Sequence, residues 1–134
     1  MLVLKNTNMK IENKLVTVIL DACFKIHRNL GPGLFESVYE HILNYELSKL
    51  GLKTLTQVPV PVVWKDIKMD KGFRADIIVE SKVIIEIKSV ETINPVHQKQ
   101  LLTYLRLTNT KLGLLINFNE ALLKNGIQRV VNGL

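Results

Sequence analysis

The segment FRADIIVESKVIIEIKSV, residues 73–90, constrains the fold of this chain more than any other. Two runs of aliphatic residues, 73–79 and 83–88, flank the short polar stretch 80–82, which is typical of two adjacent β-strands. Charged residues interrupt both runs: Asp76 in the first, Glu86 and Lys88 in the second. Because burying an unpaired charge is costly, these side chains need partners or a ligand.

The length of the connection decides whether the two acids can meet. A three-residue connection pairs residue 79 with 83 and residue 77 with 85, which sets Asp76 opposite Glu86. Cross-strand partners project from the same face, with Cβ atoms about 4.5–5.5 Å apart. A two-residue turn would place them on opposite faces. Lys88 shares the face of Glu86, because strand side chains alternate.

Two carboxylates at this separation repel each other unless a cation lies between them or one takes up a proton. Hard oxygen ligands suit Mg²⁺ or Mn²⁺, and a chain with one cysteine has no cysteine cluster for zinc. A neighbouring lysine could stabilise negative charge or orient an attacking water, so the group is suited to phosphodiester hydrolysis. The alternative is a surface hairpin whose Asp, Glu and Lys form an ordinary solvated ion pair.

Periodicity and turn residues predict the other elements. In chain order we expect helices over 10–29 and 34–50, an edge or irregular strand over 58–64, the two strands above, a helix over 96–107, a buried strand over 111–117 and a short strand over 127–131. On the second helix the apolar stripe is Phe35, Val38, Ile42 and Tyr45. The prediction is an α/β layer arrangement with a mixed sheet.

Length and composition agree with one folded domain. The chain has 134 residues, of which 47% are hydrophobic and 22% charged. No uncharged apolar run approaches the roughly 18–20 residues that span a bilayer, and the first residues do not resemble a secretion signal, so we expect a cytoplasmic protein without a membrane partner. Cys23 is expected to be a buried, inert thiol. The net charge of +6 would attract nucleic acid.

Asp76 followed by Glu86-Ile87-Lys88 resembles the D…ExK motif of the PD-(D/E)XK nuclease superfamily. Residues 33–39, GLFESVY, match the motif that gives the GxxExxY proteins their name, and NPVHQKQLLTYL and KLGLLINFN are similar to other segments of that family. The resemblance covers residues 15–131. It implies a single nuclease-like domain over 1–134 with a restriction-endonuclease-like fold, in which helices flank a central mixed sheet.

The resemblance also implies a metal site. Asp76, Glu86 and the main-chain carbonyl of Ile87 would bind Mg²⁺ or Mn²⁺, Glu36 would complete the site, and Lys88 would be the catalytic lysine. The alternative for Glu36 is a favourable acid at the start of a helix. Arg74-Ala75 stands where the superfamily customarily has a proline before the first aspartate.

Four further residues are candidates for substrate binding or site support. Gln100 and Tyr104 lie one helical turn apart, and their spacing resembles a pair that borders the metal in recombination-type nucleases. The alternative is a polar helix edge with a core tyrosine. Tyr39 is a candidate for site support, and Arg74 either reaches a phosphate or forms an ordinary salt bridge. His97 begins the helix of Gln100 and either contacts phosphate or a metal-bound water or is a helix-cap or surface histidine, and we favour the second interpretation.

The function predicted is a metal-dependent nuclease in DNA repair, recombination or defence, with DNA favoured over RNA as the partner. A homodimer or a protein partner would supply specificity. The alternatives are a non-catalytic nucleic-acid-binding or assembly module that keeps the nuclease fold, and a basic protein with no nucleic-acid role.

Overall fold

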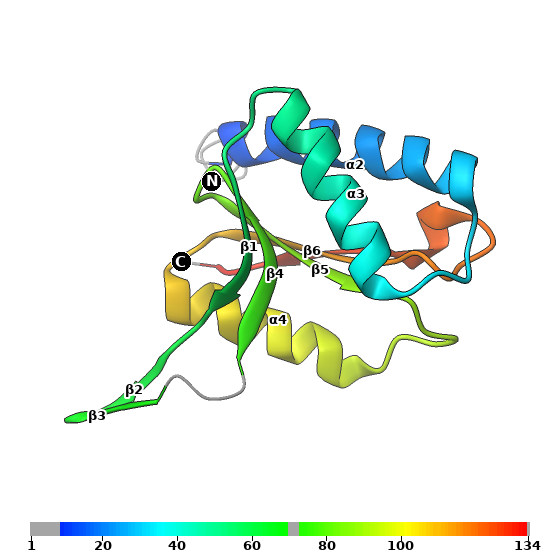
Figure 1. Ribbon diagram of the computed structural model, residues 1–134. Helices are drawn as coiled ribbons and strands as arrows, with labels where there is room; N and C mark the ends of the chain where they lie inside the picture. Colours follow the sequence, from blue (N-terminus) through cyan, green and yellow to red (C-terminus); the bar gives the residue numbers. More distant parts are fainter. Residues whose placement is uncertain (1–8, 70–72, 134) are drawn as a thin grey trace.

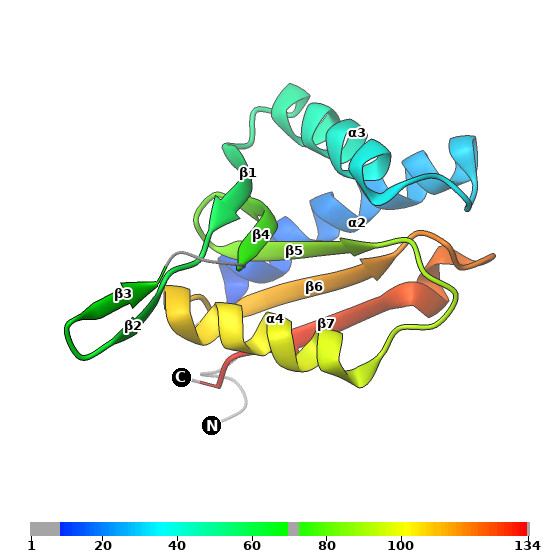
Figure 2. The ribbon, with the colours of Figure 1, turned by 60° about the horizontal axis from the view of Figure 1, so that its bottom comes forward.

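The computed structural model describes residues 9–69 and 73–133. A five-stranded sheet of strand order β1-β4-β5-β6-β7 forms its centre, and β5 and β6 are its one parallel pair. The helices α2 and α3 cover one face of this sheet and α4 covers the other (Figures 1 and 2). The elements are α2 (Lys10–Leu30), α3 (Glu36–Lys49), β1 (Thr54–Pro59), β2 (Val62–Trp64), β3 (Ile67–Met69), β4 (Arg74–Val79), β5 (Val83–Lys88), α4 (Pro95–Thr108), β6 (Leu112–Asn117), the short 3₁₀ helix η1 (Leu123–Gly126) and β7 (Ile127–Val131).

This architecture confirms the predicted fold class, a mixed sheet flanked by helices. The first eight residues and the last residue of the predicted domain lie outside the described part of the chain. Within the described part, no helix combines the length and the apolar character needed to cross a bilayer.

The hairpin of β4 and β5 has the predicted three-residue connection. Val79 pairs with Val83 and Ile77 with Ile85, which is the register expected from the sequence. Glu80 and Ser81 both adopt left-handed backbone conformations, with φ of 52° and 55°, and they reverse the chain in a tight turn. The turn is anchored to the rest of the fold, because the Glu80 main-chain N–H donates to the Lys53 carbonyl oxygen at 2.8 Å.

Two apolar clusters hold the layers together. The larger lies between the sheet and α2 and α3, and contains Ile19, Leu43, Ile85, Ile87 and Phe118 among others. The smaller packs α4 against the opposite face. All six residues of β6 are buried, as expected for an interior strand covered on both faces. Cys23 is fully buried, and this burial raises the pKa of its thiol, in agreement with an inert core residue.

The apolar stripe predicted for α3 was wrong. Phe35 is 82% exposed and lies before the helix, and Val38 and Tyr45 are exposed as well. The buried face consists of Tyr39, Leu43 and Leu47. Apolar residues occur on both sides of this helix, so periodicity alone does not choose between two stripes. The choice depends on which side α2 and the sheet cover.

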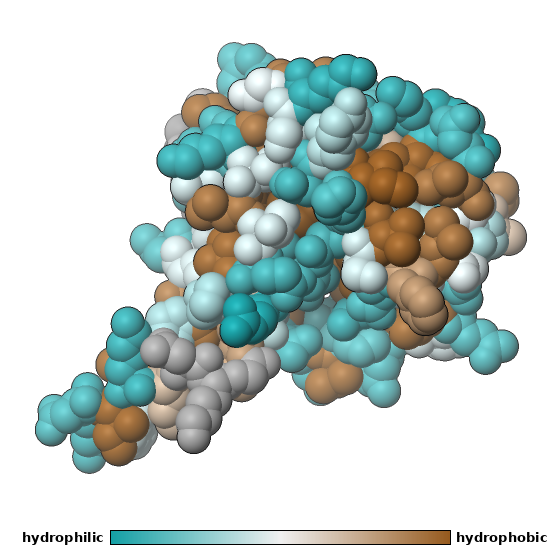
Figure 3. All heavy atoms as spheres, in the orientation of Figure 1, coloured by the Kyte–Doolittle hydropathy of each residue, from teal (hydrophilic) through white to brown (hydrophobic). Residues whose placement is uncertain are grey.

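The strand predicted over 58–64 is two strands. β1 ends at Pro59 and lies at the edge of the sheet, where proline is tolerated. β2 leaves the sheet and pairs only with β3, which the sequence did not predict because its residues, IKM, sit among charged neighbours. Together β2 and β3 form an arm that projects from the body (Figure 1). In Figure 3 hydrophobic side chains show among hydrophilic ones on this arm, and Val63, Trp64, Ile67 and Met69 are exposed.

Candidate active site

The candidate site lies where β4 and β5 part. Their main-chain pairing ends at Ile77 and Ile85, although β4 begins at Arg74 and β5 continues to Lys88. Beyond that pair, side chains replace the main-chain ladder. The Asp76 N–H donates to Glu86 Oε1 at 3.2 Å, and the Ile87 N–H donates to Asp76 Oδ2 at 2.8 Å. The two acids therefore meet across the strands, as the turn length predicted.

Glu86 is nearly buried, with 5% of its surface exposed. Burial raises the pKa of its carboxyl to about 8, and the charge of Asp76 adds to the rise. The hydrogen bond from the Asp76 main chain and the charge of Lys88 act in the opposite direction. In the absence of a cation, Glu86 therefore holds a proton near neutral pH, and a cation beside Asp76 would favour the ionised form.

The donor set fits a hard divalent cation. Asp76 and Glu86 present carboxylate oxygens to one place, and such oxygens are the ligands that Mg²⁺ and Mn²⁺ prefer. Mg²⁺ sites commonly use one or two carboxylates and leave the remaining positions to water and substrate phosphate. Across residues 9–69 and 73–133, no three His, Cys, Asp or Glu residues lie close enough to hold a metal together. Glu36 is thus not brought into one ligand cluster with this pair, and its part in metal binding stays a prediction.

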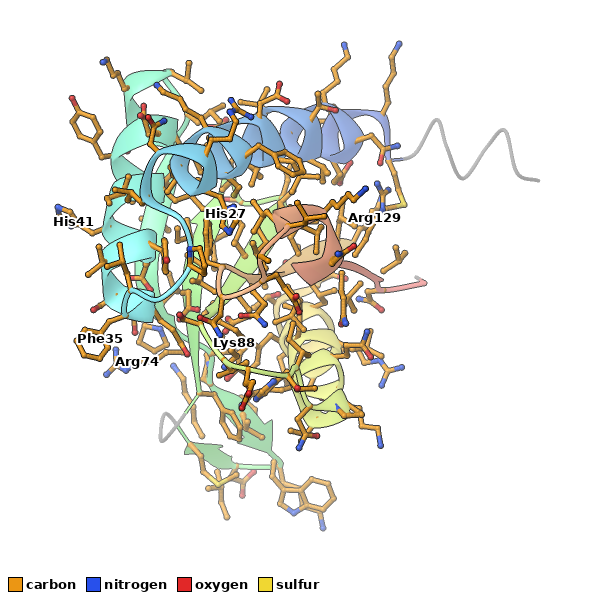
Figure 4. The ribbon with its side chains drawn as sticks, turned by 90° about the vertical axis from the view of Figure 1, so that its right-hand side faces the viewer. His27, Phe35, His41, Arg74, Lys88 and Arg129 are labelled. Atoms are coloured by element: carbon orange, nitrogen blue, oxygen red, sulfur yellow. The ribbon has the colours of Figure 1, made fainter. Side chains whose placement is uncertain are left out.

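Lys88 ends β5, is partly exposed, and lies between α3 and α4 in the view of Figure 4. Its positive charge lowers the pKa of Glu86, which places the ammonium within electrostatic reach of that carboxyl. The main chain of Lys88 is fixed from β6, because its carbonyl accepts from the Phe118 N–H at 2.9 Å. The fully buried Asn117 holds the segment after Lys88 in place. Its side chain accepts a hydrogen bond from the Val90 N–H at 3.1 Å and donates one to the Val90 carbonyl at 2.9 Å.

The motif at residues 33–39 docks the start of α3 onto the end of β5. The Tyr39 hydroxyl donates to the Gly31 carbonyl at 2.6 Å and accepts from the Leu34 N–H at 3.2 Å, and the ring stacks on Phe118 with centroids 4.4 Å apart. Ser89 Oγ in turn donates to the Leu34 carbonyl at 2.7 Å. Tyr39 is fully buried, and its part in site support or substrate binding stays a prediction.

The same loop brings Glu36 to the site side of α3. Glu36 is the first residue of that helix, and its negative charge acts on both His97 and Glu40. His97 lies near the start of α4, where burial and then the charge of Lys88 lower its pKa. Its Nδ1 is buried and has no hydrogen-bond partner among the described residues. His97 is thus partly buried and lies within electrostatic reach of Lys88 and Glu36, and its role stays a prediction.

On α4, Tyr104 is buried against the site. Burial raises the pKa of its hydroxyl, the charges of Glu86 and Asp76 act in the same direction, and a hydrogen bond with the Arg74 main chain lowers it. Its ring meets Phe73 edge-on with centroids 6.1 Å apart. Gln100, one turn earlier, is half-buried. The structure thus places Tyr104 within electrostatic reach of both acids.

Arg74 is a candidate residue of the site, whereas the sequence gives no role to the two other histidines. The Arg74 side chain is exposed and donates to the Gln57 carbonyl at 3.4 Å. The His27 ring hydrogen-bonds the Glu120 carbonyl at 2.8 Å, far along the chain from the acids, and His41 is exposed on α3.

A sequence model of the PD-(D/E)XK nuclease superfamily matches residues 13–130. The chain belongs to this superfamily. Comparison with curated proteins and with solved structures found no significant match. Membership supports a nuclease or phosphodiesterase activity in general, and PD-(D/E)XK nucleases generally use divalent metals. The assignment to the narrower GxxExxY group rests on the motif at residues 33–39 alone and stays a prediction.

Two further residues of this PD-(D/E)XK domain, Gln57 and Glu40, lie at the site but were not identified from the sequence. Gln57 of β1 donates from Nε2 to Glu40 Oε1 at 2.6 Å and to Asp76 Oδ1 at 3.3 Å. Glu40 lies one turn after Glu36 on α3 and is half-buried. Burial raises its pKa, the bond from Gln57 lowers it, and the charges of Asp76 and Glu36 raise it further. The one available signal was the spacing of Glu36 and Glu40, which places two acids on one helix face.

Proposed function

We propose that this PD-(D/E)XK protein is a nuclease that hydrolyses nucleic-acid phosphodiester bonds with Mg²⁺ or Mn²⁺, and that Asp76, Glu86 and Lys88 carry the reaction. One observation supports the proposal most strongly. At the point where β4 and β5 part, each acid bonds the main chain of the opposite strand, so that two carboxyl groups converge beside an ammonium group.

Asp76, Glu86 and the carbonyl oxygen of Ile87 would hold the cation. A bound divalent ion supplies Lewis-acid chemistry, since it neutralises charge on a phosphate and promotes the ionisation of water. Glu86 would lose its proton as the cation binds, because the positive charge cancels the cost that burial and Asp76 impose. The Ile87 N–H keeps Asp76 oriented while this happens.

Lys88 would orient the attacking water and offset the negative charge that grows on the phosphate in the transition state. Tyr104, buried beside the acids, would form one wall of the site. Arg74 is exposed next to the Gln57 carbonyl, where its guanidinium could also contact a phosphate of the bound strand. A net charge of +6 favours the approach of a polyanion.

A cleavage panel tests the proposal. The purified protein is incubated with Mg²⁺ or Mn²⁺ and single-stranded, duplex and branched DNA, and with RNA. We expect cleavage of at least one substrate that EDTA abolishes and that Asp76→Asn lowers by about 100-fold or more. Asparagine keeps the size of the side chain and an acceptor for the Ile87 N–H but removes the charge.

The matched control is Asp66→Asn, at an exposed aspartate in the turn of the arm. It should leave cleavage unchanged. If no substrate is cut with either metal and Asp76→Asn behaves as wild type in every assay, the protein is not a nuclease. In that case binding of nucleic acid without cleavage would favour an assembly or binding module.

A further inference from the structure

Gln57 occupies an unusual position in the edge strand. On either side of it β1 pairs regularly with β4, Thr56 with Ile77 and Val58 with Ala75. By this register Gln57 stands directly opposite Asp76, yet it is the one position between these pairs where the main-chain pairing is interrupted. Cross-strand partners share a face of the sheet, so the Gln57 side chain lies on the side of the candidate metal ligand.

The backbone of Gln57 is strained. Its φ of 50° lies in the left-handed region, which a residue with a Cβ adopts only at a cost in free energy. Such conformations persist where the surroundings hold them in place, and they are concentrated at functional sites. Thr56 and Val58 remain in the strand, so the distortion is confined to Gln57.

The Gln57 side chain connects two acids. Its Nε2 is 2.6 Å from Glu40 Oε1 and 3.3 Å from Asp76 Oδ1, and an amide nitrogen carries two hydrogens, one for each carboxylate. The same residue accepts a bond from Arg74 through its carbonyl oxygen. Glu40 belongs to α3, so this bridge links the helix to the strand that carries Asp76.

The bridge completes the fixation of Asp76. One carboxylate oxygen accepts from the Ile87 N–H at 2.8 Å and the other from Gln57. A carboxylate with a donor on each oxygen cannot rotate freely, and its remaining lone pairs stay available to a cation. Partners of this kind orient metal ligands and typically contribute 10- to 100-fold to metal affinity.

We infer that Gln57 is a positioning residue that sets the orientation of Asp76 for metal binding, with Glu40 as its anchor. The inference rests on the proposed function, because it gives Gln57 a role only if Asp76 binds a cation. It contrasts with a purely structural role, in which the bridge ties α3 to the sheet and has no effect on the metal.

Gln57→Gly separates the two roles. Glycine adopts a φ of 50° without strain, so the backbone shape is kept while the side chain with its bridging amide is lost. The affinity for Mn²⁺ is measured by calorimetry on the metal-free protein, and stability by thermal unfolding. We expect the Kd for Mn²⁺ to rise about 10-fold while the melting temperature stays the same or increases. An unchanged Kd overturns the inference.

Lys65→Gly is the matched control. Lys65 also has a positive φ, 52°, but lies in the turn of the arm. Its replacement should leave the Kd for Mn²⁺ unchanged, so a general effect of relieving strain would be recognised.

A second pair of variants tests the anchor. If Glu40 acts through Gln57, Glu40→Ala weakens Mn²⁺ binding in the wild type but adds nothing in the Gln57→Gly background. Additive effects would mean that Glu40 acts independently, and would overturn its part of the inference. Failure of the proposed function gives a different result, since the wild-type protein would then bind no Mn²⁺ at this site.

Discussion

The two ends of the β4–β5 hairpin are built from the same strands but differ in how the strands are joined and in the side chains they carry. At the turn end, Val79 pairs with Val83 and Ile77 with Ile85 through the main chain, and all four side chains are buried in the larger core. At the open end the main-chain pairing stops, and Asp76 and Glu86 use their carboxyl groups to bond the opposite backbone.

This difference shows how a small domain can carry a charged site within its central sheet. Regular pairing and apolar burial at the turn end fix the register of the strands. The register then forces the two acids together at the open end, against their mutual repulsion. The residues that stabilise the hairpin and the residues of the candidate site are therefore direct neighbours in β4: the regular pairing ends at Ile77, and the site begins at Asp76.

The largest effect we expect comes from comparing the two lysines that flank β5. Lys88→Met should lower cleavage by about 10²- to 10⁴-fold, because the ammonium beside the acids is lost. Lys82→Met, at the exposed turn end, should leave cleavage unchanged. Rates under metal saturation measure both. Equal effects of the two variants would mean that the open end has no special role.

The next effect concerns pH and the metal-free protein. The pKa of Glu86 is raised from an ordinary value of 4.5 to about 8, so between these values the folded state binds a proton that the unfolded chain has released. The free energy of unfolding should therefore fall as the pH rises through this range, because the unfolded chain binds fewer protons than the folded state. Thermal unfolding in EDTA measures it.

Two variants check the source of this pH dependence. Glu86→Gln should remove it, and Glu80→Gln, in the turn, should not. Saturating Mn²⁺ at pH 8 should restore the lost stability. If Glu86→Gln unfolds with the same pH dependence as wild type, the buried acid is not its source.

At the turn end we expect an effect on folding alone. Ile85→Ala removes a fully buried side chain from the larger core and should lower the free energy of unfolding by about 2–5 kcal/mol. At a temperature where the variant is still folded, its Kd for Mn²⁺ should match that of wild type. A large loss of metal affinity in the folded variant would show that the two ends are not separable.

The smallest effect concerns the loop that supports the open end. Tyr39→Phe keeps the ring stacked on Phe118 but removes the hydroxyl that bonds Gly31 and Leu34. We expect a loss of about 1–2 kcal/mol in the free energy of unfolding, measured by denaturant titration. Tyr45→Phe, at an exposed tyrosine of the same helix, is the control and should change little.

Local rules predicted much of this molecule. The alternation of aliphatic residues and the three-residue connection predicted the β4–β5 register, and the apolar run 112–116 predicted that β6 is a buried strand. Both follow from interactions between residues close in the sequence, or from burial on both faces of a strand. The apolar face predicted for α3 was wrong because apolar residues occur on two sides of that helix. Strand β3 was not predicted because it is only three residues long and has charged neighbours on both sides.

The sequence by itself predicted that Asp76 and Glu86 face one another with Lys88 on the same side, because strand periodicity and a three-residue connection together give that register. Only the tertiary structure decided which other groups join them. Glu40 and Gln57, which the sequence did not identify, come from two separate elements, and their approach to Asp76 depends on how α3 and β1 pack around the open end. Packing of this kind is set by the sum of many distant contacts, and no local pattern encodes it.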